Sequence, residues 1–119
     1  MGYTLHANGS LLRLKFIGDF TEADLQAYMQ EFTPYLKTAT AENPIRFLVD
    51  IQQLNKLCSQ ARKQFTELNG NRCIDKVSIV GVNPFFKVLV TFILKVSNRN
   101  NIQFVLTEAE ALAWLSEDA

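Results

Sequence analysis

The chain has little of what metal sites and disulfide frameworks need. Its 119 residues contain two cysteines, Cys58 and Cys73, and a single histidine, His6. The cysteines form no CxxC pair, and one histidine beside them leaves too few soft ligands for a structural zinc site. We therefore expect free thiols and no bound metal or other cofactor.

Excess charge and a secretion signal are also missing. Twelve basic and twelve acidic residues cancel, so no field of one sign surrounds the domain to attract nucleic acid or an acidic membrane. The start, MGYTLHANGS, lacks the basic and apolar segments of a signal peptide. These absences argue against nucleic-acid binding and predict a cytoplasmic location.

No segment is apolar enough to span a membrane. The most apolar run is FFKVLVTFILKV at residues 85–96, which contains Lys87 and Lys95. A spanning helix needs about 20 apolar residues. We expect no stable membrane insertion.

Motifs for nucleotide binding and catalysis are absent as well. The sequence has neither of the usual glycine-rich phosphate-binding motifs. An enzyme would need His6, Asp50 and a thiol such as Cys58 to converge in one cleft. Asp50 ends a predicted interior strand, where open α/β sheets place ligands, although such a residue more often caps a loop. We predict that the chain is not an enzyme.

The first predicted element is a β-hairpin. Asn8-Gly9 separates two alternating segments, residues 3–6 and 11–17. This pair suits the two positive-φ positions of a type I′ turn, so we expect the turn there and the hairpin near a sheet edge.

A helix should follow the hairpin. Thr21 is a good N-cap, and apolar residues recur after it at three- and four-residue spacing. Pro34 lies within this pattern and removes one main-chain hydrogen bond. We expect a kink or an early end at Pro34.

Nearly all-apolar segments predict three interior strands, at residues 45–51, 76–82 and 102–106. The first should end at Asp50 and lead into a loop. Ser59 should cap the next helix, which Asn69-Gly70 would end.

Strands alternate with helices from residue 45 onward, which predicts parallel pairing with right-handed crossovers. No linker, repeat or low-complexity stretch divides the chain. We therefore predict one α/β domain over residues 1–119. It should have a mixed sheet of about five strands and about four helices, in the order β-β-α-β-α-β-α-β-α, packed as a pair of layers.

The apolar run lies in a predicted helix over residues 84–98. Asn83 is a good N-cap, and Pro84 fits the first helical position. The polar side chains gather on one side of this helix: Lys87, Thr91, Lys95 and Asn98. Apolar residues cover well over half of the circumference, which is more than one sheet contact needs.

The element order and three stretches resemble one known family. The stretches are GDFTEADLQAY, KVSIVGV and FVLTEAEALAWL, the last with a capping box of Thr107 and Glu110. Together they resemble the SpoIIAA-like branch of the STAS superfamily, the fold of bacterial anti-sigma-factor antagonists, over nearly the whole chain. The resemblance implies a small mixed-sheet domain with helices mostly on one face, acting in bacteria through protein contacts.

The same resemblance implies a phosphorylation site. In the regulatory antagonists a kinase phosphorylates a serine, within an Asp-Ser-Ser/Thr-Gly-Leu motif, at the start of the helix after the central strand. Alignment on Asp50 places Ser59 there, without the preceding acid and the following glycine. Ser59 is then either only a helix cap or a phosphoserine that the helix N-terminus would stabilise.

Two functions would use the surplus apolar surface of residues 84–98, and complete burial is the alternative to both. In one, a protein partner or a second copy of the chain covers it. In the other, it lines a cavity for a small apolar, lipid-like ligand, by analogy with lipid-carrying domains. The residues that would form it are Phe85, Phe86, Leu89, Phe92 and Val96. We favour a non-enzymatic interaction module that self-associates through this helix.

A modest basic cluster would suit an acidic partner. It comprises Lys56, Arg62, Lys63, Arg72 and Lys76, whereas the last helix carries Glu108, Glu110, Glu117 and Asp118. Patches of opposite sign suit a charged partner or self-association, although a solvated face is the usual case. Arg62 and Lys63 are the two residues that we expect at such a surface.

Overall fold

In the computed structural model, which describes residues 2–71, 73–81 and 83–116, the N-terminal hairpin forms one edge of the sheet. β1 (Tyr3–Asn8) pairs antiparallel with β2 (Leu11–Phe20), with Asn8 opposite Leu11. The turn is therefore Gly9-Ser10, and Gly9 has a φ of 63°. Ser10 has no positive φ, and a positive φ at the first turn residue alone is the type II′ pattern, whereas type I′ needs both. The predicted turn at Asn8-Gly9 is wrong by one residue.

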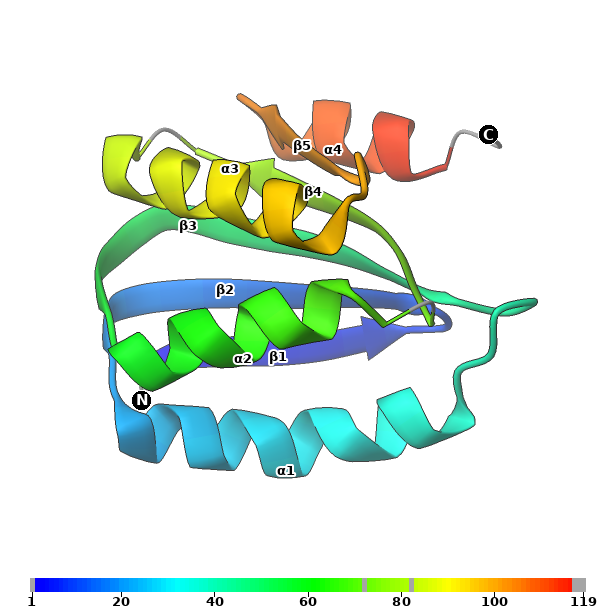
Figure 1. Ribbon diagram of the computed structural model, residues 1–119, viewed down its shortest axis with the longest axis horizontal. Coiled ribbons are helices and arrows are strands. Elements are labelled where there is room, and N and C mark those ends of the chain that lie inside the picture. Colours follow the sequence, from blue (N-terminus) through cyan, green and yellow to red (C-terminus); the bar gives the residue numbers. More distant parts are fainter. Residues whose placement is uncertain (1, 72, 82, 117–119) are drawn as a thin grey trace.

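The strands lie in the order β1-β2-β3-β4-β5, and every pair after the hairpin is parallel. The other strands are β3 (Ile45–Leu57), β4 (Ile74–Val80) and β5 (Ile102–Val105). The helices are α1 (Glu22–Thr38), α2 (Ser59–Asn69), α3 (Pro84–Ser97) and α4 (Glu108–Leu115). The predicted mixed α/β sheet and element order are confirmed (Figure 1).

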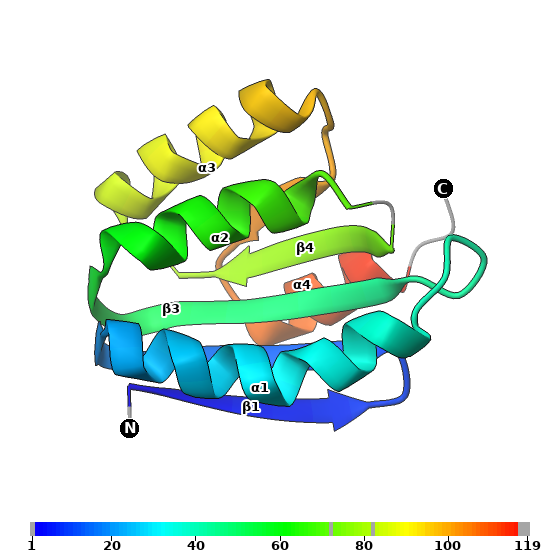
Figure 2. The ribbon, with the colours of Figure 1, turned by 60° about the horizontal axis from the view of Figure 1, so that its bottom comes forward.

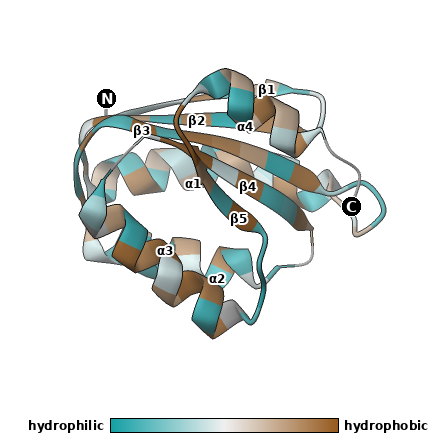
Figure 3. Ribbon diagram, turned by 90° about the horizontal axis from the view of Figure 1, so that it is seen from above, coloured by the Kyte–Doolittle hydropathy of each residue, from teal (hydrophilic) through white to brown (hydrophobic). Residues whose placement is uncertain are grey.

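Helices cover both faces of the sheet, so the predicted pair of layers is wrong. α1, α2 and α3 lie side by side on one face, with α2 in the middle (Figure 2). α4 lies on the other face (Figure 3). It contacts a smaller core that includes Leu48, Val80 and Val105. Because the interior parallel strands are apolar on both sides, one layer of helices could not bury them.

β3 is longer than predicted. The segment after Asp50, predicted as a loop, continues as a strand to Leu57. β2 also runs on, to Phe20, and supplies a partner: Ile17 lies opposite Gln53. Pairing with a long neighbour thus keeps a polar segment extended. β4 begins two residues before the predicted 76–82, whose Val82 lies outside the described residues.

α1 does not end at Pro34. Thr21 caps its start as predicted, because the Thr21 side chain accepts a hydrogen bond from the main-chain N–H of Asp24. The helix continues to Thr38, and Leu36 packs against the large core beyond the proline. The apolar contacts of this last turn offset the missing main-chain hydrogen bond.

Local sequence signals also fix the start of α3. The side-chain oxygen of Asn83 accepts a hydrogen bond from the Phe86 N–H at 3.1 Å, and Pro84 is the first helical residue, as predicted. Gly81, after β4, has a φ of 123°, and a Cβ there would lie 3.2 Å from Gln52 and Ile51. Glycine therefore allows the chain to turn from β4 toward α3.

Candidate functional site

α3 carries apolar side chains on two separate sides. Phe86, Val90 and Ile93 face the sheet and are buried. Val88, Phe92 and Val96 follow one another at four-residue spacing and are 72%, 57% and 57% exposed. We call these three residues the outer ridge. α3 thus has apolar surface beyond the part that the sheet covers.

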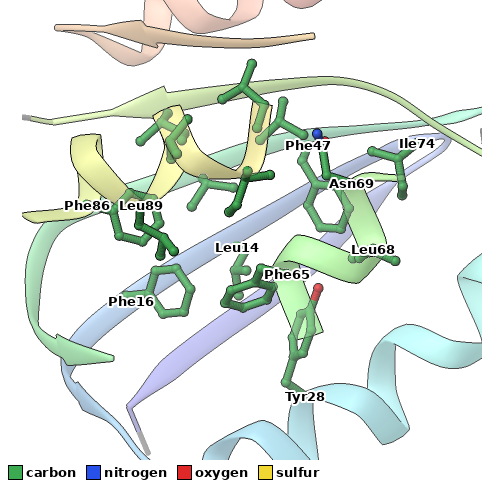
Figure 4. A pocket seen from close by; sticks show the side chains of 16 residues that line it. Leu14, Phe16, Tyr28, Phe47, Phe65, Leu68, Asn69, Ile74, Phe86 and Leu89 are labelled. Atoms are coloured by element: carbon green, nitrogen blue, oxygen red, sulfur yellow. The ribbon is translucent and has the colours of Figure 1, made fainter. Parts of the chain in front are cut away.

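The inner side of α3 lines a cavity of about 70 Å³ between the sheet, α2 and α3 (Figure 4). Its walls include Leu14 of β2, Phe65 and Leu68 of α2, and Phe86 and Leu89 of α3. On this measure of volume, a cavity needs about 10–15 Å³ to hold one water molecule. The cavity therefore has room for only a few non-hydrogen atoms.

Two polar side chains, Tyr28 and Asn69, belong to the wall of this cavity. Asn69 is buried and exchanges two hydrogen bonds with Asn101, at 3.2 and 3.1 Å. Tyr28 is 1% exposed, and its hydroxyl has no hydrogen-bond partner within the described residues. The hydroxyl points from α1 toward α2 (Figure 4). Burial raises the pKa of Tyr28, which keeps this group protonated.

The predicted apolar surface does not form one site. Phe86 and Leu89 line the cavity, whereas Phe92 and Val96 point outward as part of the outer ridge. The side chain of Phe85 lies outside the described residues. A docking surface and a ligand cavity would therefore use different residues. Val88, the most exposed member of the ridge, was missing from the prediction, although its spacing from Phe92 and Val96 could have revealed it.

The predicted basic cluster is also divided. Lys76 bonds to the Trp114 carbonyl at 3.3 Å, and its ammonium nitrogen lies 5.2 Å from the centre of the Trp114 ring, on the α4 face. Arg62 and Lys63 are exposed on α2, which covers the opposite face. Arg72 lies outside the described residues. Of the residues placed here, Arg62 and Lys63 lie on the helix beside α3.

Ser59 is the first residue of α2, and its side chain is exposed. The N-cap is Cys58, which makes no capping hydrogen bond through its side chain. The prediction that Ser59 caps the helix is therefore wrong by one residue. The Cys58 N–H bonds to the Phe20 carbonyl at 3.1 Å, so pairing with β2 holds the chain up to Cys58 and the helix begins directly after it.

His6, Asp50 and Cys58 do not converge. Cys58 packs against the large core, which α1, α2 and α3 cover. His6 is exposed on β1, and its neighbour Leu5 packs toward that core, so His6 faces the other side of the sheet. An oxygen of Asp50 accepts a hydrogen bond from the Gln52 N–H at 2.9 Å, a local role within β3. Among the described residues, no three His, Cys, Asp or Glu side chains are grouped to hold a metal ion.

The apolar helix α3 is too short to cross a bilayer. At about 1.5 Å per residue, the 14 residues of α3 extend about 21 Å, against about 30 Å for the hydrocarbon core. Within the described part of the chain, no helix has the length and apolar character of a membrane span.

Several solved structures are similar to this fold. One is an uncharacterized protein of the DUF3478 family from Shewanella loihica PV-4, which has a SpoIIAA-like fold. It is 22% identical with a TM-score of 0.65, and the match covers 95% of this chain and 91% of that protein. The anti-sigma factor antagonist SpoIIAA in its unphosphorylated form is 10% identical with a TM-score of 0.68, covering 98% and 99%. An anti-sigma factor antagonist from Mycobacterium paratuberculosis is 13% identical with a TM-score of 0.63, covering 97% and 93%.

These likenesses establish the fold, and the predicted SpoIIAA-like fold is confirmed. No curated protein matches the chain in sequence. A family model, however, matches residues 17–118, which is most of the chain. The chain therefore belongs to the family described as "Domain of unknown function (DUF7793)".

Proposed function

We propose that the chain is a non-enzymatic bacterial regulatory module that binds a protein through the outer ridge of α3. The observation that carries this proposal is the exposure of Val88, Phe92 and Val96 along one line of the helix. Large exposed apolar side chains in a row favour contact with another protein, because that contact removes them from water. The fold that the chain shares with anti-sigma factor antagonists supports a regulatory role. The partner is another protein or a second copy of the chain.

Crosslinking at the outer ridge tests this proposal. A photoreactive residue in place of Val88 should give one defined adduct in cells of the source organism, and Phe92→Ser in the same chain should abolish it. Leu106, which is 68% exposed, supplies the matched control position, where no adduct should form. An adduct of twice the mass of the chain would identify a second copy. Equal adducts at both positions would contradict a specific docking role for the ridge.

We propose further that phosphorylation of Ser59 regulates this binding. Its hydroxyl is exposed at the first position of α2, where the positive end of the helix favours negative charge. Arg62 and Lys63 follow within one turn and are the proposed contacts for an acidic partner.

Ser59→Asp, a change at an exposed residue, should alter the free energy of unfolding by less than about 0.5 kcal/mol. The same variant should lower the crosslinking yield at position 88, with Ser59→Ala as control. Unchanged yield would exclude regulation at Ser59.

A carrier of a small apolar ligand is the second candidate. The cavity beside Phe86 and Leu89, with the unpaired hydroxyl of Tyr28 at its wall, favours it. At about 70 Å³ the cavity cannot hold a lipid chain unless α2 and α3 move apart. We therefore place this function second.

A further inference from the structure

We infer that the partner of the outer ridge is an acidic amphipathic helix of another protein rather than a second copy of this chain. The inference rests on the proposed docking function of α3 and specifies the occupant of its surface.

The charge of α3 has one sign. Lys87 and Lys95 are exposed, and the helix from Pro84 to Ser97 contains no acidic residue. At about 100° per residue, Lys95 projects within about 20° of Val88 around the helix axis, so it borders the outer ridge. The hydroxyl of Thr91, between the lysines, donates to the Lys87 carbonyl at 2.9 Å and is thus satisfied within α3. Lys87 projects about 100° from Val88, so a partner would meet apolar side chains with the ammonium group of Lys95 beside them and that of Lys87 farther around the helix.

A second copy fits this surface poorly. A two-fold contact of α3 against α3 would bring lysines toward lysines, and like charges brought together disfavour association. The acids of α4 are engaged within their own chain: Glu108 forms an ion pair with Arg13, and Glu110 accepts a hydrogen bond from the Thr107 hydroxyl at 3.3 Å. Charge complementarity therefore favours a foreign, acidic partner over a two-fold contact of α3 with itself.

The spacing of the ridge favours a helix as that partner. Side chains four residues apart form the ridge that fits between the side-chain rows of another helix. A partner helix with an apolar stripe bordered by Asp or Glu would cover Val88, Phe92 and Val96 and pair with Lys95, with Lys87 adding positive charge at longer range. The neighbouring α2 lies in the same layer and carries Arg62 and Lys63 against one exposed acid, Glu67, so it adds net positive charge (Figure 2).

Two designed peptides test the inference with the intact chain. Both form an amphipathic helix with the same leucine stripe, one with glutamate and one with lysine at the bordering positions. Fluorescence anisotropy should show the acidic peptide binding at least about tenfold more tightly, with an affinity that falls as salt is added. Phe92→Ser should abolish binding, whereas the control Leu106→Ser should not. Lys87→Glu with Lys95→Glu should reverse the preference, and Lys37→Glu, an exposed charge on α1, should leave it unchanged.

The outcomes separate this inference from the proposed function. Equal binding of both peptides, insensitive to the lysine changes, would overturn the acidic partner but keep a docking ridge. Failure of both peptides, together with a dimer by sedimentation that Phe92→Ser dissociates, would make a second copy the occupant. Failure of both peptides with a monomeric chain would overturn the inference and the docking function together.

Discussion

Replacement of Arg99 by alanine should lower the free energy of unfolding by about 3 kcal/mol. The guanidinium donates to the main-chain carbonyls of Asn69 at 2.9 Å, Asn71 at 3.1 Å and Ile74 at 2.7 Å. Asn69 ends α2, Ile74 begins β4, and Asn71 lies between them. One side chain from the segment after α3 therefore holds this connection in place. Hydrogen bonds to a charged group each contribute about 1.5–3 kcal/mol. Because Arg99 is half-buried, water would replace part of this contribution in the alanine variant.

Urea or thermal unfolding measures this loss, which should lower the melting temperature by about 10 °C in a chain of this size. Arg99→Lys should recover less than half of it, because an ammonium group cannot reach three carbonyls with the planar fork of guanidinium. Lys95→Ala, an exposed change in α3, should alter stability by less than about 0.5 kcal/mol. A loss below about 1 kcal/mol for Arg99→Ala would mean that solvent already satisfies these carbonyls.

The helix starts were predictable because their signals are local. Thr21, Asn83 and Thr107 each accept a hydrogen bond from a main-chain N–H of the first helical turn that follows them. Such a contact depends on residues three apart in the sequence, so the sequence alone contains it. The start of α2 is the exception, because a main-chain hydrogen bond to Phe20 of β2 holds Cys58 in place.

The errors in the fold arise where a distant partner decides the conformation. The polar end of β3 is a strand only because β2 extends alongside it to Phe20. Likewise, α1 continues beyond Pro34 because Leu36 packs against the large core. The role of Arg99 depends on three carbonyls between the end of α2 and the start of β4, and no spacing within the sequence could have revealed it.

The candidate site was predictable as a helix but not as a surface. Helical spacing shows that α3 is apolar over more than half of its circumference. It cannot show which neighbour covers which part. The structure assigns Phe86 and Leu89 to the cavity and Phe92 to the solvent, and it adds Val88 to the exposed row. The two functions inferred from one strip of sequence therefore involve two sides of the helix.

Replacement of Tyr28 by phenylalanine should raise the free energy of unfolding by about 1–2 kcal/mol. The hydroxyl is buried without a hydrogen-bond partner in the described structure, and burying an unpaired hydroxyl costs about 1–3 kcal/mol. The ring would keep its packing, including a stacked contact with Phe32 whose ring centre lies 5.4 Å away. Denaturant unfolding measures the gain, and Tyr35→Phe is the control, because Tyr35 is 39% exposed.

A loss of stability in Tyr28→Phe would instead show that the hydroxyl has a partner in the folded protein. The cavity beside it could hold a water molecule or part of a small ligand, and the two can be separated. If the loss disappears when both proteins are unfolded, extracted with solvent and refolded, the partner was a bound small molecule, and the carrier function gains support. If the loss persists after refolding, water is the partner, because it returns with the solvent, and the cavity is a structural feature of the core.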